Sequence, residues 1–258
     1  MKVIFQDNNL LVLDKPAGLV VDKSNTQAAD TLEDILKKDF NIQLERGGIV
    51  HRLDKDTSGV ILVAKTQEAL ENLQAQFRMR KTKKEYLALV HGVIGEKGII
   101  RGDIGRNPQK REKFAVLEAD GKEAVTEYEP LGNFKFQISN FQTVFTDLNK
   151  IQLRKLERMN YNQFTLLRCY PKTGRTHQIR VHLKYINHPI VADEVYGGRK
   201  IVRLDHRWCP RQFLHAAKLG FYHPVSSKWM EVESPVPEDL EKALLSLRGA
   251  IATKQSVE

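Results

Sequence analysis

The sequence predicts a mixed α+β fold, because its expected strands outnumber its expected helices and do not alternate strictly with them. Strand patterns occupy residues 2–6, 10–16, 19–21, 59–65, 84–92, 124–131, 164–170 and 228–234. Helical patterns occupy residues 30–40, 66–78, 176–186 and 237–247. A doubly wound parallel sheet would need a crossover helix between successive strands, so we expect a different topology.

Each strand prediction depends on a short apolar or alternating run bounded by turn residues. Residues 10–16 (LLVLDKP) end at a Pro-Ala-Gly turn, and residues 59–65 (GVILVAK) are continuously apolar, as in a strand buried on both faces. Residues 84–92 (KEYLALVHG) alternate between two apolar sets. Among the helices, Thr66 is placed to cap residues 66–78, and residues 176–186 end shortly before Pro189.

The composition indicates a globular protein that binds a polyanion. The chain has 258 residues, 41% of them hydrophobic, and a net charge of +9 with a pI of about 9.4. Its longest apolar runs are too short to span a bilayer, and Asp7 precedes any long apolar stretch, so we expect neither a membrane partner nor a secretion signal. Cys169 and Cys209 have no metal-binding or redox spacing, which fits a reducing cytoplasm.

Residues 51–60 (HRLDKDTSGV) concentrate the chemistry of the sequence. An EF-hand calcium loop starting at Asp54 would need an acidic ligand at its twelfth position, which is Lys65, so calcium is excluded. A phosphoryl-accepting aspartate is a weak alternative, because no second acidic pair for magnesium follows downstream. An Asx-type turn suits Asp56 and its neighbours, but Asp54 has companions elsewhere in the chain that favour a catalytic role.

The sequence resembles the RluA-type pseudouridine synthases of the RluA/RsuA superfamily. The resemblance depends on HRLDKDTSGVILVAK (51–65), DKPAGLVV (14–21), KEYLALVHG (84–92), TGRTHQIRVHL (173–183), DEVYGG (193–198) and FLHAAKLGFYHP (213–224), in this order. It implies a pseudouridine synthase catalytic fold with a mainly antiparallel central sheet flanked by helices and loops. It also implies isomerisation of a uridine in RNA, with no metal and no cofactor.

The resemblance assigns three catalytic residues. Asp54 is the carboxylate that acts as nucleophile or base, Arg180 is its guanidinium partner, and Tyr86 lies against the target base. A guanidinium would keep a desolvated carboxylate ionised and would fix its orientation. The plainer alternatives are a surface phosphate contact for Arg180 and an ordinary core aromatic for Tyr86.

Further residues are expected to contact RNA. Arg52 matches a position whose side chain fills the space left by a flipped base, although a phosphate contact is nearly as good an explanation. Ile179 and Leu183 are expected as apolar walls of the base pocket, and His51 as a structural residue. The remaining predicted RNA contacts are Arg78, Arg80, Lys81, Lys83, Lys84, Arg175 and His177. The alternative for such charged runs is a solvated surface.

We expect one catalytic domain at residues 1–247, a frayed tail at 248–258 and no separate N-terminal RNA-binding domain. Residues 133–163 are a possible insertion, in which residues 150–158 (KIQLRKLER) have the pattern of a basic amphipathic helix. Ribosomal RNA is the preferred target ahead of transfer RNA, and a monomer is expected. A zinc site of His206, Cys209 and His215 is not expected, because the spacing is irregular, only one thiol is present and His215 belongs to the FLHA part of the resemblance. A non-catalytic RNA-binding or ribosome-assembly protein on the same fold is the second hypothesis.

Overall fold

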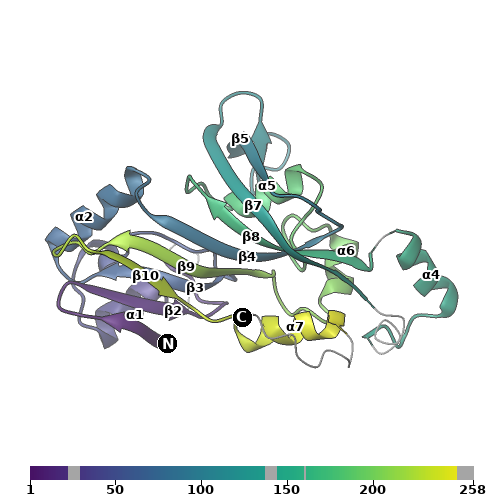
Figure 1. Cartoon of the computed structure of the whole chain (residues 1–258), viewed down its shortest axis with the longest axis horizontal. Helices are drawn as coiled ribbons and strands as arrows, with labels where there is room; N and C mark the ends of the chain where they lie inside the picture. Colours follow the sequence, from purple (N-terminus) through teal and green to yellow (C-terminus); the bar gives the residue numbers. More distant parts are fainter. Residues whose placement is uncertain (23–29, 137–143, 160, 249–258) are drawn as a thin grey trace. The chain divides into compact units, whose positions relative to one another are not determined.

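The computed structural model describes residues 1–22, 30–136, 144–159 and 161–248 (Figure 1). Contacts divide the chain into two compact units. Unit 1 comprises Met1–Tyr86 and Leu214–Val236, and unit 2 comprises Leu87–Phe213 and Pro237–Glu258. The chain passes from unit 1 to unit 2 within strand β4 (Lys83–His91). Helices accompany a mainly antiparallel arrangement of strands, which confirms the predicted α+β class.

Unit 1 has strands in the order β1-β2-β3-β9, with β10 paired to β9. All of these pairings are antiparallel except that between β3 and β9. The bounds of the strands are β1 (Lys2–Gln6), β2 (Leu10–Lys15), β3 (Ser58–Ala64), β9 (Leu214–Tyr222) and β10 (Trp229–Glu233). The helical segments of unit 1 are α1 (Leu32–Asp39), the 3-10 helix η1 (Glu45–Gly48) and α2 (Gln67–Arg78).

The sheet of unit 1 is buried on both faces, which explains why residues 60–64 of β3 are all apolar. On one face Leu11 and Ile61 pack with residues of α1. On the other face Leu10 and Leu62 pack with residues of α2. Because side chains alternate between the faces of a strand, a strand covered on both sides needs apolar residues at every position.

The starts of both α-helices in unit 1 follow from their sequences. Thr66 accepts a hydrogen bond from the backbone N–H of Ala69, which confirms the predicted cap of α2. Thr31 and Asp34 form a capping box at the start of α1. In contrast, the predicted strand at residues 19–21 is wrong. The carbonyl oxygens of Val20 and Val21 accept hydrogen bonds from the first N–H groups of α1, so this segment caps a helix and does not join the sheet.

Unit 2 contains an antiparallel arrangement in the order β8-β7-β5-β6. Its strands are β5 (Gly98–Arg106), β6 (Phe114–Leu117), β7 (Lys122–Lys135) and β8 (Gln163–Pro171). Its helices are α4 (Lys150–Arg158), α5 (Gln178–Tyr185), α6 (Arg199–Asp205) and α7 (Glu238–Arg248). Val181 of α5 packs on Ile104 and Ala124, so α5 covers part of the sheet formed by β5 and β7.

The predicted amphipathic helix at residues 150–158 coincides with α4. Of the surrounding segment 133–163, residues 137–143 and 160 lie outside the described residues, as do residues 249–258 of the predicted tail. The single catalytic domain stays a prediction. Among the described helices, none combines the length and the apolar composition needed to cross a membrane.

Candidate active site

The acidic loop, which we define as residues 51–57, is tied to the turn that follows β2. The side chain of Lys15 is fully buried, and its Nζ donates to the carbonyl oxygens of Pro16 (2.9 Å), Leu19 (2.8 Å) and Lys55 (2.9 Å). The backbone N–H of Gly18 donates to the same Lys55 carbonyl at 2.9 Å. Because Lys55 directly follows Asp54, these bonds fix the backbone beside the candidate catalytic carboxylate.

The end of the acidic loop is held by a buried histidine. His215 Nε2 lies 3.0 Å from the carbonyl oxygen of Ser234, which can only accept, so this nitrogen carries the proton. In the neutral imidazole Nδ1 then accepts from the hydroxyl of Ser58, 2.9 Å away. Gly59 follows with φ +115°, and a Cβ there would lie 2.2 Å from the carbonyl oxygen of Ala216. Close packing of β3 on β9 therefore requires this glycine.

His51 is structural, as predicted. Its Nε2 accepts a hydrogen bond from the backbone N–H of Leu62 at 3.0 Å, and its ring stacks on Phe77 with centroids 4.7 Å apart. Burial, assisted by the positive charge of Lys84, lowers the pKa of His51 to about 3. The imidazole therefore stays neutral and holds the start of the acidic loop against β3 and α2.

Asp54 and Tyr86 lie near one another in unit 1. Both side chains are half-buried, whereas Asp56 is exposed. The pKa of the Tyr86 phenol is raised, first by burial and then by the negative charge of Asp54. The backbone N–H of Thr57 donates to the carbonyl oxygen of Asp54 at 3.1 Å, so Asp54 opens a tight turn. The structure thus brings together two of the three predicted catalytic residues.

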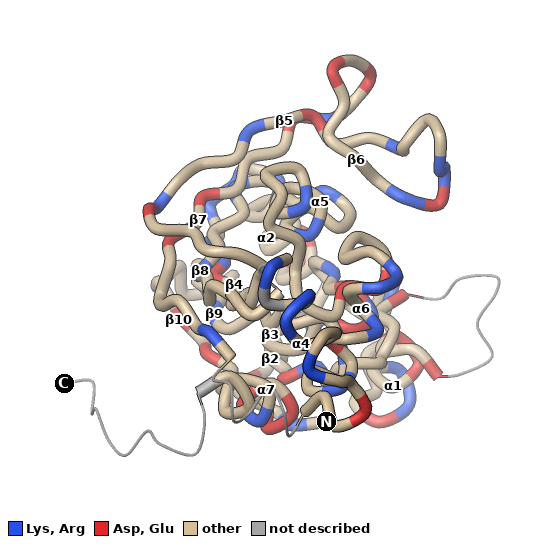
Figure 2. The backbone as a smooth tube through the Cα atoms, turned by 90° about the vertical axis from the view of Figure 1, so that its right-hand side faces the viewer, with Lys and Arg blue, Asp and Glu red and all other residues tan. Residues whose placement is uncertain are grey.

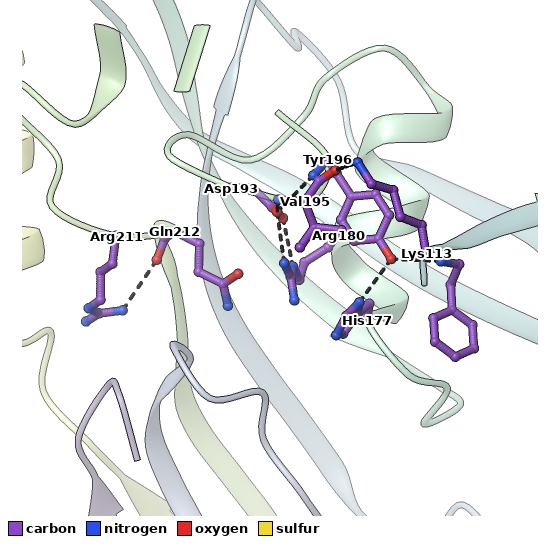
Figure 3. A network of polar contacts seen from close by, with 9 residues as sticks. Lys113, His177, Arg180, Asp193, Val195, Tyr196, Arg211 and Gln212 are labelled. Atoms are coloured by element: carbon purple, nitrogen blue, oxygen red, sulfur yellow. Dashed lines mark hydrogen bonds and ion pairs between the residues drawn. The ribbon is translucent and has the colours of Figure 1, made fainter. Parts of the chain in front are cut away.

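Arg180 is held in unit 2 by the buried carboxylate of Asp193, a residue without a predicted role. Its Nε and one terminal nitrogen donate to the two carboxylate oxygens of Asp193 at 2.7 and 2.9 Å (Figure 3). Asp193 is fully buried and Arg180 is 6% exposed. The same carboxylate accepts from the backbone N–H groups of Val195 (3.0 Å) and Tyr196 (3.1 Å). This two-point contact fixes the plane of the guanidinium.

The helix that carries Arg180 is anchored at its first residue. The side chain of Gln178 donates to the carbonyl oxygen of Val125 and to the hydroxyl of Thr126, both at 3.0 Å. Its oxygen accepts from the hydroxyl of Thr173 (2.7 Å) and the N–H of Arg175 (3.0 Å). The start of α5 is therefore fixed on β7. Because Arg180 follows two residues later in the same helix, the position of its backbone is fixed as well.

Tyr196 links Arg180 to the start of β6. The guanidinium carbon of Arg180 lies 5.2 Å from the centroid of the Tyr196 ring. The phenol oxygen accepts from the backbone N–H of Phe114 (3.2 Å) and lies 3.0 Å from Nδ1 of His177. In addition, Lys113 Nζ donates to the carbonyl oxygen of Val195 at 2.5 Å. Figure 3 shows these side chains converging from separate parts of unit 2.

The predicted apolar wall residues and RNA contacts have different environments. Ile179 (5% exposed) and Leu183 (0%) are buried in α5. The predicted RNA contacts differ in their exposure. The exposed ones are Arg52, Arg78, Arg80, Lys81 and Lys83, and the half-buried ones are Lys84, Arg175 and His177. Figure 2 shows further Lys and Arg residues, mixed with Asp and Glu, along the chain around β5 and β6.

The residues rejected as zinc ligands have other contacts. His215 lies between Ser58 and Ser234, and the thiol of Cys209 donates to the carbonyl oxygen of Arg211 at 3.1 Å. Within the described parts of the chain, no three or more histidine, cysteine or acidic side chains are grouped so as to hold a metal ion.

The residues that position the candidate catalytic groups were not predicted from the sequence. Lys15 and Asp193 both belong to motifs used for the family resemblance, DKPAGLVV and DEVYGG, but neither received a role. A lysine or aspartate inside a motif otherwise made of turn residues is a usable signal, because such side chains are rarely fully buried unless they are paired.

The family described as RNA pseudouridylate synthase matches residues 9–185, more than two thirds of the chain. This chain belongs to the RNA pseudouridylate synthase family. The predicted family is thereby confirmed, and the matched range includes Lys15, Asp54, Tyr86 and Arg180. Asp193 lies beyond it.

Two curated members of the family are similar over nearly the whole chain. Ribosomal large subunit pseudouridine synthase D of Nitrosomonas europaea is 40% identical over 258 residues, which cover 96% of this chain and 65% of that protein. The protein of the same name from Xanthomonas campestris pv. campestris is 39% identical over 258 residues, covering 96% of this chain and 70% of that protein. This chain thus spans about two thirds of the length of these relatives.

The fold is shared with a solved member of the family. Human RNA Pseudouridylate Synthase Domain Containing 1 superposes with a TM-score of 0.69 and 25% identity, covering 93% of this chain and 86% of that chain. The catalytic fold implied by the sequence resemblance is therefore confirmed.

Proposed function

We propose that this protein isomerises specific uridines in RNA to pseudouridine, with the carboxylate of Asp54 as the reacting group. One observation carries the proposal. In a chain of the RNA pseudouridylate synthase family, Asp54 is half-buried on a backbone clamped by Lys15, and its charge acts on the phenol of Tyr86.

The reaction moves the glycosidic bond of uridine from N1 to C5. The bond from C1′ to N1 breaks, the base turns, C1′ bonds to C5, and the proton on C5 leaves for N1 through a shuttle. Positive charge that develops at C1′ is stabilised by an ionised carboxylate, which acts as nucleophile or as base. The number of electrons in the base and sugar is unchanged, so the reaction needs no redox cofactor.

We assign Arg180 as the guanidinium partner of Asp54. Its support is the rigidity of the guanidinium, which the buried Asp193 carboxylate and the anchored start of α5 hold in one orientation. A preorganised donor needs little rearrangement when a charged partner binds, and an arginine cannot lose its proton at physiological pH. Asp193 is then a positioning residue and not a catalytic one.

Tyr86 is proposed to lie against the base as a neutral phenol. Its raised pKa keeps the proton on the phenol oxygen at physiological pH, so Tyr86 is given no role as an anion. The phenol can still donate a hydrogen bond and pack against a flipped ring. Proton removal from C5 is therefore assigned first to the carboxylate.

The proposed substrate is a ribosomal RNA, ahead of a transfer RNA, because the two curated relatives are named for the large ribosomal subunit. The exposed Arg52, two residues before Asp54, is proposed to fill the space left by the flipped uridine. In the structure its guanidinium lies 3.5 Å from the carboxylate of Asp22. Arg78, Arg80, Lys81, Lys83, Lys84, Arg175 and His177 are proposed to contact the RNA, and Ile179 and Leu183 to line the base pocket.

We further propose a cytoplasmic monomer. The free, buried thiols of Cys169 and Cys209 support a reducing compartment. Size-exclusion chromatography with light scattering at several protein concentrations tests the monomer directly.

The decisive experiment compares the wild type with the Asp54→Asn variant, which removes the charge and keeps the size of the side chain. Each protein is incubated with uridine-containing ribosomal RNA in the presence of EDTA, and pseudouridine is detected chemically and mapped. The wild type is expected to form pseudouridine and the variant to lose at least a thousand-fold in rate, because the reacting group is gone.

RNA affinity is measured for both proteins by filter binding. Retained affinity with lost turnover would separate catalysis from binding. Equal turnover of the two proteins would refute the role of Asp54, and turnover by neither would favour a non-catalytic RNA-binding protein.

A further inference from the structure

We propose that unit 1 carries a second RNA-binding site, an exposed Trp229–Tyr222 corner that stacks one unpaired base of a single-stranded segment. The basic segment, residues 78–84, supplies the phosphate contacts of this site. The inference rests on the proposed function to the extent that it assumes an RNA substrate, but it uses neither Asp54 nor Tyr86.

The corner is formed by two aromatic side chains on neighbouring strands. Trp229 of β10 is paired directly with Tyr222 of β9. Their ring centroids are 5.0 Å apart and the ring planes make an angle of 70°. Trp229 is 36% exposed and Tyr222 is 44% exposed. A flat floor with an upright wall is the shape that accepts the face and edge of one base.

The floor of the corner is rigid. The indole of Trp229 lies against Gly220, where a Cβ would come within 2.4 Å of indole carbon Cζ2. The absence of a side chain at Gly220 therefore lets the indole lie close to β9. The indole N–H donates to Glu231 at 3.3 Å, which restrains the rotation of the ring. A preset aromatic surface loses little conformational freedom when a base stacks on it.

The basic segment is clamped beside this corner by one buried amide. Gln76, 7% exposed, donates from Nε2 to the carbonyl oxygen of Tyr222 at 2.7 Å, and its Oε1 accepts from the N–H of Tyr222 at 2.8 Å. The N–H of Lys81 donates to the carbonyl oxygen of Gln76 at 2.9 Å, so the segment turns back near the end of α2. Lys83 Nζ then lies 5.3 Å from the centroid of the Trp229 ring.

The charge beside the corner favours a polyanion. Five cationic side chains lie in the basic segment, at residues 78, 80, 81, 83 and 84. The carboxylates on the neighbouring strand positions are those of Glu85, Glu231 and Glu233, and Glu233 is paired with Lys218 at 2.5 Å. With Lys218 these are six cationic residues and three acidic ones, a balance that suits the phosphates on either side of a stacked base.

Single-stranded RNA fits these features better than a duplex does. A base inside a helix shows only its edge, whereas an unpaired base offers its face to an aromatic ring. Stacking on an aromatic side chain tolerates every base, since all bases have a π face. The site would therefore bind an unpaired nucleotide without reading its identity.

The test uses oligoadenylate, because it contains no uridine and cannot be a substrate of the proposed reaction. Binding of fluorescein-labelled oligoadenylate is measured by anisotropy at two salt concentrations. We expect Trp229→Ala to weaken binding about ten-fold and Trp229→Phe to restore most of it, as stacking predicts. Lys83→Gln is expected to weaken binding less and to reduce its salt dependence.

Two matched controls lie away from the corner in the sequence. Tyr185→Ala removes another exposed aromatic, 58% exposed, and Lys242→Gln removes another exposed lysine. Both are expected to bind oligoadenylate like the wild type. Thermal unfolding of every variant establishes that it is folded. Unchanged affinity of folded Trp229→Ala would overturn the proposal, and so would equal competition by polyglutamate, which would indicate an acidic protein partner.

Failure of this site and failure of the proposed function give different results. If Trp229-dependent binding of oligoadenylate occurs while the wild type forms no pseudouridine, the stacking site stands and the catalytic proposal fails. If pseudouridine forms and Trp229→Ala binds oligoadenylate normally, the catalytic proposal stands and the stacking site fails.

Discussion

The two units position their charged candidate residues in opposite ways. In unit 1 the carboxylate of Asp54 lies on a loop, and a buried lysine orders that loop through backbone carbonyl oxygens. In unit 2 the guanidinium of Arg180 lies on a helix, and a buried aspartate grips the functional group itself. Lys15 thus fixes the backbone beside Asp54, whereas Asp193 fixes the side chain of Arg180.

The difference follows from the reach of the two side chains. An aspartate has a short side chain, so fixing its backbone nearly fixes its carboxylate. An arginine has a long flexible stem, and fixing the helix leaves the guanidinium free to move unless a second group holds it. We expect this contrast to appear in how variants of the two units fail.

The largest effect is expected from Asp193→Ala. The substitution leaves the guanidinium of Arg180 in a buried site without its two-point partner, which costs about 3–5 kcal/mol of folding free energy. Urea unfolding followed by circular dichroism measures the loss. The neighbouring Glu194→Ala, at an exposed position, serves as the control and should change stability by less than about 0.5 kcal/mol. Equal effects of the two variants would contradict the assigned role of Asp193.

A smaller loss is expected from Lys15→Met, which keeps the length of the side chain. Three carbonyl oxygens lose a charged donor, and we expect a loss of about 2–3 kcal/mol in unfolding free energy. Pseudouridine formation should fall more than RNA affinity does, because the backbone beside Asp54 is released. Lys55→Ala is the control, since only the backbone carbonyl of Lys55 takes part. A stable, fully active Lys15→Met protein would show that the clamp is dispensable.

A pH dependence is expected from two histidines with lowered pKa values, the half-buried His51 in unit 1 and the buried His182 in unit 2. Burial lowers the pKa of His51 to about 3 and that of His182 to about 4. Below about pH 6.5 the unfolded chain binds protons that the folded chain refuses, so stability falls as the pH drops from 6.5 toward these values. Each histidine contributes a slope of up to about 1.4 kcal/mol per pH unit.

Urea midpoints at pH 7, 6 and 5 measure this slope. His51→Gln is expected to remove one histidine's share of it while leaving the share of His182. NMR chemical shifts of the imidazole nitrogens should show both rings neutral at pH 5. A ring of His51 that titrates near pH 6.5 would contradict its assignment as a neutral acceptor.

The smallest effect is expected from Tyr196→Phe. The ring beside Arg180 remains, but the phenol oxygen no longer contacts Phe114 and His177, which costs about 1 kcal/mol. Tyr185→Phe, on the exposed surface of α5, is the control. Because Asp193 still holds Arg180, turnover should change little. A loss as large as that of Asp193→Ala would mean that the phenol and the carboxylate act as one unit.

Much of the fold was predictable from local patterns. The strand at 59–65 and the cap at Thr66 were found because each has a strong local signal, either a continuous apolar run or a capping residue. The strands β5, β6 and β9 were missed. Residues 98–106 mix glycine and charge with isoleucine, and residues 214–222 lack clear alternation, so neither segment has a pattern typical of a strand.

The error at residues 19–21 has a different cause. The sequence LVV favours a strand by propensity, but the carbonyl oxygens of Val20 and Val21 are used by the first amides of α1. The strand propensity of a short segment is overridden when a neighbouring element offers better hydrogen bonds to its backbone. The sequence of three residues does not show which element will lie beside them.

Residue types and motif order were enough to indicate the family, the α+β class and the three candidate catalytic residues, because chemistry leaves a signature in the types and spacing of side chains. The partners of those residues needed coordinates. Lys15 reaches a carbonyl oxygen forty positions away, and Asp193 meets Arg180 from a separate turn. Contacts of this kind arise when the folded chain excludes water and each buried charge must find a partner, and that condition is set by packing across distant segments.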